Sequence, residues 1–221
     1  MNRCMSRFVE IDHVGYSSGA LTRLSDGRKF PHELDFSRSD IIDIRSETMT
    51  DMSISGVQDK ISLRLDRGRL QPTSKHGEYI LKPVPSGELP ERHDDVSANE
   101  NLTMQLAAQV FSINTAANAC IRLADGELAY ITRRFDRTRD GDKIAQEDFC
   151  QLMERTQRSH GKNYKYDSSY EELASTLDSY CNVYVIEVEK LFRRILFNYL
   201  VANGDAHLKN FSLRQSEEFG D

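Results

Sequence analysis

The stretch Asn203-Gly204-Asp205-Ala206-His207-Leu208-Lys209-Asn210 lies between a long apolar helix pattern and a short strand pattern at 211–213. Asp205 and Asn210 are five positions apart, which is the spacing found in the catalytic loop of a phosphotransferase. In such a loop the aspartate accepts or orients the proton of the attacking hydroxyl, and the asparagine supplies an oxygen to magnesium. Asp and Asn are also common turn formers, so an ordinary helix-to-strand turn is the competing interpretation.

Three weaker signals precede this loop. The stretch Ser53-Ile54-Ser55-Gly56-Val57-Gln58-Asp59-Lys60 leads into a strand pattern, and its glycine lets backbone N–H groups approach phosphate oxygens. A flexible turn before the strand is the alternative. Lys82 ends an apolar strand, where its ammonium either meets a phosphate or is solvated. Glu100 fits two roles, as the partner of Lys82 or as the capping-box partner of Ser97, and spacing alone favours the cap.

The order of these signals favours a joint interpretation over separate turns. A small-residue loop, a strand lysine, a helix glutamate, a hairpin at Asp125-Gly126 and a D-x-x-x-x-N loop follow one another as they do in a two-lobed protein kinase. Alternation and turn residues predict strands at 61–65, 69–71, 78–81, 120–123 and 128–131. Helical spacing predicts a helix over 97–110, with Leu102, Leu106 and Val110 on one face, and another with a wide apolar face over 188–200.

We therefore predict an α+β, protein-kinase-like fold with two lobes. Residues 1–133 are expected to form an N-lobe, an antiparallel sheet with one helix that carries the glycine loop and the lysine–glutamate pair. Residues 134–221 are expected to begin a helical C-lobe that holds the catalytic loop and is incomplete. The boundary follows from the shift in composition near residues 134–145.

Composition narrows the class of protein further. Among 221 residues, 38% are hydrophobic and 29% are charged, which argues against an extended disordered chain and against a membrane span. The net charge of −6 gives no general attraction to a nucleic-acid backbone. The four cysteines include no CxxC pair, and the first nine residues lack the apolar core of a signal peptide. We expect a cytoplasmic chain with free thiols that contacts neither membrane nor nucleic acid directly.

Several of these motifs together resemble the HipA family of serine/threonine kinase toxins. They are the stretch 53–60, Ile80-Leu81-Lys82-Pro83, Asn99-Glu100, Arg133-Arg134-Phe135-Asp136-Arg137, Gln146-Glu147-Asp148 and the loop 203–210. The Ser-Ile-Ser sequence, and a start close before the glycine loop, resemble the small-toxin HipT branch of HipB–HipS–HipT systems.

The resemblance implies a set of roles. Asp205 would be the catalytic aspartate, Asn210 would bind Mg²⁺, and Ser53 and Ser55 would be autophosphorylation sites. The cofactors would be ATP and Mg²⁺. The residues that would contact ATP are Ile54, Ser55, Gly56, Val57, Gln58, Asp59, Lys82, Glu100, Arg133, Arg134, Phe135, His207, Leu208, Lys209 and Asn210.

The same resemblance implies partners and a biological effect. Family members phosphorylate a serine of an aminoacyl-tRNA synthetase and so inhibit translation, as toxins of type II toxin–antitoxin systems. The expected partners are that synthetase, a HipS-like protein that supplies the N-terminal subdomain, and a HipB-like DNA-binding antitoxin.

One departure from the family pattern qualifies this expectation. A second magnesium-binding aspartate, in a Tyr-Asp pair, follows the catalytic loop in the family, whereas this sequence stops at Asp221. We therefore expect a C-terminally truncated chain that has little kinase activity by itself and self-associates through its apolar helix. The alternative function is a truncated pseudokinase that binds nucleotide or antitoxin without phosphotransfer.

Overall fold

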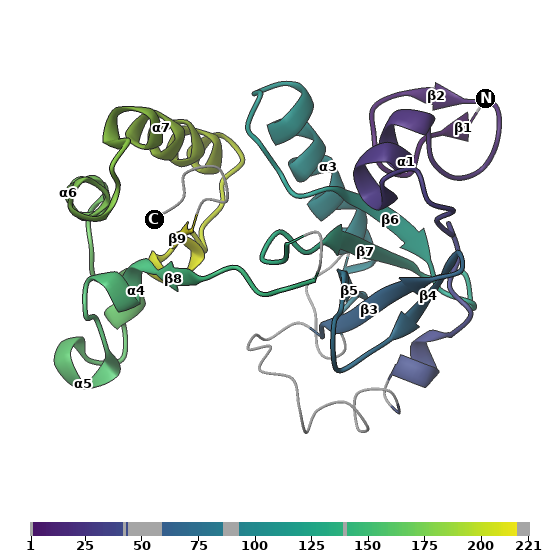
Figure 1. Cartoon of the computed structure of the whole chain (residues 1–221), viewed down its shortest axis with the longest axis horizontal. Coiled ribbons are helices and arrows are strands. Elements are labelled where there is room, and N and C mark those ends of the chain that lie inside the picture. Colours follow the sequence, from purple (N-terminus) through teal and green to yellow (C-terminus); the bar gives the residue numbers. More distant parts are fainter. Residues whose placement is uncertain (1, 42, 44–58, 86–92, 139–140, 216–221) are drawn as a thin grey trace. The chain divides into compact units, whose positions relative to one another are not determined.

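The computed structural model describes residues 2–41, 43, 59–85, 93–138 and 141–215 (Figure 1). The chain divides into two compact units, Met1–Asp142 and Lys143–Asp221. Each unit has a hydrophobic core of its own. The division into lobes at 133/134, and the roles assigned to the lobes, stay predictions. The stretch 53–58 lies outside the described residues.

The first unit is built on a five-stranded antiparallel sheet with the order β4-β3-β5-β7-β6 (Figure 1). All five strands expected from the sequence are confirmed, with ends that move by at most two residues. A turn that contains Gly126, whose φ is +87°, joins the last two strands. The strands are β3 (Ile61–Asp66), β4 (Arg69–Pro72), β5 (Tyr79–Lys82), β6 (Asn118–Arg122) and β7 (Leu128–Arg133). A small N-terminal ladder pairs β1 (Asn2–Arg3) with β2 (Glu10–Ile11).

The two faces of this sheet differ in chemistry. One face is apolar and carries Tyr79, Leu81 and Ile131, which pack in the core with helix α1 (Ser18–Ser25). The Tyr79 hydroxyl donates a hydrogen bond to the Leu24 carbonyl of that helix at 2.7 Å. Because side chains alternate along a strand, Lys82 points to the opposite face. That face meets helix α3 (Val96–Gln109), which follows the 3₁₀ turn η1 (His93–Asp95).

Helix α3 docks on the sheet through buried polar side chains. Gln105 and Asn118 are 1% and 2% exposed, and the Gln105 Nε2 donates to the Asn118 Oδ1 at 2.7 Å. Gln109 donates to Gln105 Oε1 at 2.7 Å, which extends this amide ladder along the helix. The face on which the sequence places Leu102, Leu106 and Val110 is largely accessible, since Leu102 and Val110 are 47% and 61% exposed. The sheet face that meets the helix carries Asn118 beside Cys120 and Tyr130. The Gln105–Asn118 hydrogen bond therefore helps to decide which side of α3 is buried.

In its described residues the second unit contains four α-helices and a two-stranded ladder (Figure 1). Its elements are β8 (Gln146–Asp148), α4 (Phe149–Leu152), α5 (Gln157–His160), the 3₁₀ turn η2 (Tyr164–Tyr166), α6 (Tyr170–Tyr180), α7 (Tyr184–Leu200), the 3₁₀ turn η3 (Leu208–Asn210) and β9 (Ser212–Arg214). The strand expected at 211–213 is β9, shifted by one residue, and it pairs antiparallel with β8. The core includes Phe149, Leu173, Leu191, Leu208 and Phe211.

The helix expected at 188–200 is confirmed and begins earlier, at Tyr184. Leu191 belongs to the core of the second unit, and Phe197 is also buried. Tyr184, Val188 and Ile195 are partly buried against that core. Other apolar side chains of α7 are exposed, and Phe192 and Tyr199 are 64% and 82% accessible. Within the described ranges, no helix has the length and apolar character that crossing a membrane requires.

The amide ladder generates a stability prediction. Replacing Asn118 with Leu keeps the side-chain volume similar but leaves the Gln105 amide buried without its acceptor. We expect the free energy of unfolding of the first unit to fall by about 1–3 kcal/mol. Urea denaturation followed by circular dichroism measures this change.

Ser97→Ala is the matched control on the same helix face. The Ser97 hydroxyl is buried and has no hydrogen-bond partner among the described residues, so its removal should leave the urea midpoint unchanged or raise it slightly. Equal midpoints for Asn118→Leu and the wild-type chain would show that the ladder does not stabilise the helix–sheet contact.

Candidate active site

The first cluster of candidate residues lies between the sheet and α3. Lys82, at the end of β5, forms an ion pair with Glu100, in the second turn of α3, through Nζ and Oε1. The two side chains are 23% and 27% exposed, so both charges are partly withdrawn from water. The Lys82 Nζ also lies 5.3 Å from the centroid of the Tyr130 ring, within the range of a cation–π contact.

This pair settles the two alternatives that spacing left open for Glu100. The capping box with Ser97 is wrong: α3 begins at Val96, and its N-cap residue, Asp95, makes no side-chain capping bond. Ser97 therefore lies inside the first turn with its hydroxyl buried. The carboxylate of Glu100 instead reaches across to the strand, because an ammonium in a partly buried position attracts it more strongly than a backbone N–H does.

Sequence reasoning missed a third charged member, Lys60. Ile61 is paired with Leu81, so Lys60 lies one position beyond that pair, on the strand face that carries Lys82. Burial lowers the pKa of Lys60 and the charge of Lys82 lowers it further, whereas Glu100 opposes the shift. The signal was present in the sequence, since Lys60 alternates with the apolar Ile61 at the strand entrance. Two ammonium groups around one carboxylate leave a net positive charge that suits an anion such as phosphate.

Asp59 is engaged in the framework of the first unit. Its carboxylate lies 3.7 Å from the guanidinium of Arg38, and both side chains are largely buried. The backbone N–H of Arg38 in turn donates to Asp125 at 2.7 Å. This contact anchors the end of the stretch 53–60 to the hairpin turn. Ser53, Ile54, Ser55, Gly56, Val57 and Gln58 lie outside the described residues, so their predicted roles stay predictions.

Arg133 directs its side chain away from Lys82. It pairs with Tyr79 across the strands, and its guanidinium holds both carboxylate oxygens of Asp26 at 3.0 and 2.7 Å, beside the end of α1. The side chain therefore lies on the apolar face of the sheet, opposite the ion pair with Glu100. Any contact of Arg133 with a nucleotide at Lys82 has to come from its backbone.

The next residues form a compact arginine cluster. Arg134 grips Asp136 through two hydrogen bonds of 2.9 and 2.6 Å, and Arg137 adds a third at 2.8 Å. Partial burial acts to raise the pKa of Asp136, but the bonds and charges of the two arginines outweigh it and hold that pKa below its usual value. Phe135, between these two arginines in the sequence, is 55% exposed.

The second cluster is the loop that carries Asp205 in the second unit. The backbone of Asp205 is fixed at both ends, because its N–H donates to Asn203 Oδ1 at 3.2 Å and its carbonyl accepts from the His207 N–H at 2.9 Å. Leu208 anchors the loop in the core and is 3% exposed. The Asp205 side chain is 73% exposed, so its carboxylate is accessible to a substrate.

Asn210 is arranged as an oxygen donor. Its amide Nδ2 donates to the Asp205 carbonyl, which turns the amide Oδ1 away from the loop. Lys209 and Asn210 are both exposed. No group of three or more His, Cys, Asp or Glu side chains suited to a metal occurs within the described part of the chain. A magnesium ion at Asn210 would therefore rely mainly on phosphate and water oxygens, as Mg²⁺ often does.

Tyr166 is a further contact of Asp205 that sequence reasoning missed. Its hydroxyl donates to Asp205 Oδ1 at 3.1 Å, and His207 Nε2 lies 3.6 Å from the same oxygen. No motif signals this residue, because Tyr166 and Asp205 are 39 positions apart.

Comparison with known proteins places the chain in a family. The model of the HipA-like C-terminal domain matches residues 52–220. A Haemophilus influenzae protein named "Putative kinase" is 32% identical over 206 residues, which cover 90% of this chain and 58% of that protein. "Putative kinase Y4mE" of Sinorhizobium fredii is 32% identical over 177 residues, covering 76% and 39%. The chain thus spans little more than half of the first relative.

A solved structure shares the fold. A chain in the complex of Shewanella oneidensis MR-1 HipA, HipB and operator DNA superposes with a TM-score of 0.56 at 24% identity, over 82% of this chain and 47% of that one. The predicted α+β, HipA-like fold is confirmed by this match.

The charge cluster generates a prediction on Lys60. In Lys82→Met, the loss of a neighbouring positive charge should raise the pKa of Lys60 toward its ordinary value of 10.5. In Glu100→Gln, the loss of the carboxylate should lower that pKa further. A ¹³C NMR titration of the lysine ε-carbons measures both shifts.

Lys75→Met serves as the control, since Lys75 is an exposed lysine of the same unit and its removal should leave the titration of Lys60 unchanged. Identical pKa values of Lys60 in Lys82→Met and Glu100→Gln would contradict the arrangement of three charges.

Proposed function

Because this chain belongs to the HipA-like C-terminal domain family, we propose that it is an ATP-dependent serine/threonine kinase toxin of a type II toxin–antitoxin system. The observation that carries the proposal is the Lys82–Glu100 ion pair between strand and helix. A protein kinase requires this pair, because it holds a lysine ready for the phosphates of ATP.

In this proposal the residues of the first unit bind the nucleotide. Lys82 contacts the phosphates, and Lys60 adds a second positive charge beside it. The stretch Ser53-Ile54-Ser55-Gly56-Val57-Gln58-Asp59 covers the phosphates with backbone N–H groups, and phosphorylation of Ser53 or Ser55 would add charge that repels them. The segment Arg133-Arg134-Phe135 borders the adenine.

The loop of the second unit supplies the chemistry of transfer. Asp205 orients the acceptor hydroxyl and accepts its proton. A bound Mg²⁺ would supply positive charge against the negative charge that develops on the phosphate during transfer. The Asn210 Oδ1 is the oxygen that this chain offers to the ion, and Lys209, with its exposed ammonium, lies beside it for a phosphate.

The proposed acceptor is a serine of an aminoacyl-tRNA synthetase, so that phosphorylation inhibits translation. We also propose a HipB-like DNA-binding antitoxin as a partner, which the fold similarity to a chain of a HipA–HipB–DNA complex supports. A HipS-like protein that contributes an N-terminal subdomain is proposed from the HipT-like motifs alone.

A second candidate function is a nucleotide- or antitoxin-binding module without phosphotransfer. It requires only the Lys82–Glu100 site, which the described part of the first unit contains. The two functions share the first-unit site and differ only in whether the Asp205 loop is used.

Asp205→Asn tests the kinase directly. The substitution preserves side-chain shape but removes the proton acceptor, so phosphate transfer from labelled ATP should fall by about 10²–10⁴-fold. ATP affinity, measured by calorimetry in the presence of Mg²⁺, should stay the same in this variant and should weaken in Lys82→Met.

Asp178→Asn is the matched control, because Asp178 is an exposed aspartate of the same unit, on α6. It should transfer phosphate like the wild-type chain. If the wild-type chain binds ATP through Lys82 but transfers no phosphate, the second candidate function, the binding module, replaces the proposed kinase. Equal transfer by Asp205→Asn and the wild-type chain would overturn the assignment of Asp205.

A further inference from the structure

We propose that Tyr166 is the positioning residue of the Asp205 carboxylate, an inference that rests on the proposed function. Tyr166 holds one carboxylate oxygen, Oδ1, so that the other, Oδ2, is presented to the acceptor hydroxyl. Arg155 holds the turn that carries Tyr166.

The contacts to Asp205 are asymmetric. The Tyr166 hydroxyl and the His207 Nε2 both approach Oδ1, at 3.1 and 3.6 Å. Among the residues that the structure describes, none forms a hydrogen bond or ion pair with Oδ2. One oxygen is thus occupied by the protein while the second remains available as a proton acceptor.

This contact matters because the carboxylate has little else to fix it. The backbone of Asp205 is held by Asn203 and His207, but the side chain is 73% exposed. An exposed aspartate samples several side-chain rotamers, and its terminal torsion is broad. A hydrogen bond to one named oxygen removes that freedom, which is what an oriented proton acceptor needs.

The Tyr166 ring is itself braced. It packs edge-on against the His207 ring, with the centroids 5.1 Å apart and the planes at 82°. The His207 side chain is only 8% exposed, so it forms a fixed wall on one side of the tyrosine. Tyr166 remains 52% exposed, so burial of its ring explains little of its placement.

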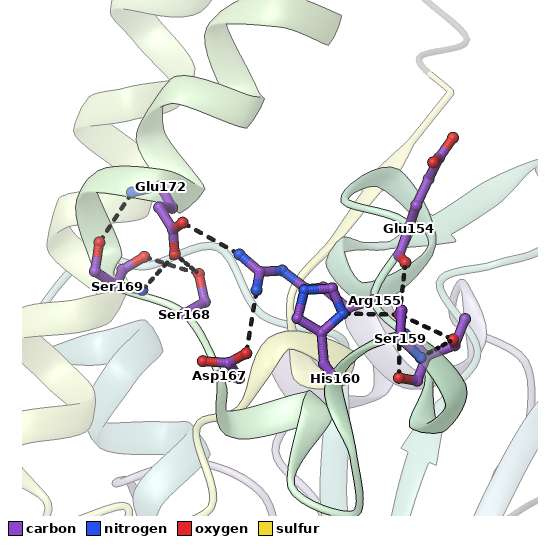
Figure 2. A network of polar contacts seen from close by, with 9 residues as sticks. Glu154, Arg155, Ser159, His160, Asp167, Ser168, Ser169 and Glu172 are labelled. Carbon is purple, nitrogen blue, oxygen red and sulfur yellow. Dashed lines mark hydrogen bonds and ion pairs between the residues drawn. The ribbon is translucent and has the colours of Figure 1, made fainter.

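A polar network fixes the turn that carries Tyr166 (Figure 2). The guanidinium of Arg155 lies between two carboxylates, 3.2 Å from Asp167 and 3.1 Å from Glu172 (Figure 2). Glu172 accepts from the Ser169 N–H at 3.0 Å, as part of the capping box that starts α6. The residue next to Tyr166 is therefore tied through Arg155 to the beginning of a core helix.

Tyr164 provides a matched control within the same turn. It is partly buried against the core of the second unit, and within the described ranges its hydroxyl makes no hydrogen bond. Tyr164→Phe and Tyr166→Phe therefore delete the same atom from neighbouring tyrosines, and only the second deletion removes a contact to Asp205.

The first test is steady-state kinetics of Mg²⁺-dependent transfer from ATP, using the full chain. Tyr166→Phe should lower kcat by about 10- to 100-fold, because the Asp205 carboxylate is no longer held in one orientation. The KM for ATP should stay unchanged, because the substitution removes no contact with the nucleotide. Arg155→Met should lower kcat in the same direction. Tyr164→Phe should match the wild-type chain. A fall in stability alone would not separate kcat from KM in this way.

The second test is hydrogen–deuterium exchange of the peptides that cover 203–211, which requires no turnover. Exchange should be several-fold faster in Tyr166→Phe than in Tyr164→Phe. Equal exchange in these two variants would overturn the positioning role. Equal kcat values for Tyr166→Phe and Tyr164→Phe would also overturn it, provided that Asp205→Asn abolishes transfer. If Asp205→Asn transfers phosphate normally, the proposed function of Asp205 fails instead, and the exchange data alone decide whether Tyr166 orders the loop.

Discussion

Lys82 and Glu100 join a strand to a helix through opposite charges that are both partly withdrawn from water. Such a pair gains Coulomb energy and loses hydration, so its net contribution to stability is small, but loss of either partner leaves an uncompensated charge. The pair therefore constrains its surroundings more than it stabilises them. α3 must keep Glu100 over β5.

The amide ladder formed by Gln109, Gln105 and Asn118 holds α3 in the position that this ion pair requires. Apolar contacts are non-directional. The hydrogen bond between Gln105 and Asn118, in contrast, forms only in one registry of helix and strand. Glu100 and Gln105 lie on the same helix, so the registry fixed by the amides also places the carboxylate at Lys82. The exposure of Leu102 is a consequence, because the side of α3 that carries the polar groups is turned inward.

In the second unit, the Asp205 carboxylate is oriented by hydrogen bonds. Asp205 must be accessible and yet oriented, so burial cannot hold it. Hydrogen bonds from the loop fix its backbone, and Tyr166 holds one oxygen of its carboxylate. Arg155 contacts both Asp167, next to Tyr166, and Glu172 at the start of α6, and so links the turn of Tyr166 to that helix (Figure 2). Partly buried guanidinium groups, which are planar and donate in fixed directions, suit this purpose.

The sequence by itself determined the elements and the order of the motifs. Alternation predicted β3, and the prolines at 83 and 85 marked the end of β5. The Asp125-Gly126 turn predicted the β6–β7 hairpin and helical spacing predicted α7, because these patterns depend on local backbone geometry. The spacing of Asp205 and Asn210 likewise identified the candidate loop. Only the tertiary structure decided that Glu100 pairs with Lys82 instead of capping its helix, and that α3 buries its polar side. It also decided that Lys60 belongs to the first cluster and Tyr166 to the second. Each of these outcomes depends on which groups lie opposite across a packed interface, and the spacing of residues along one chain carries no information about that.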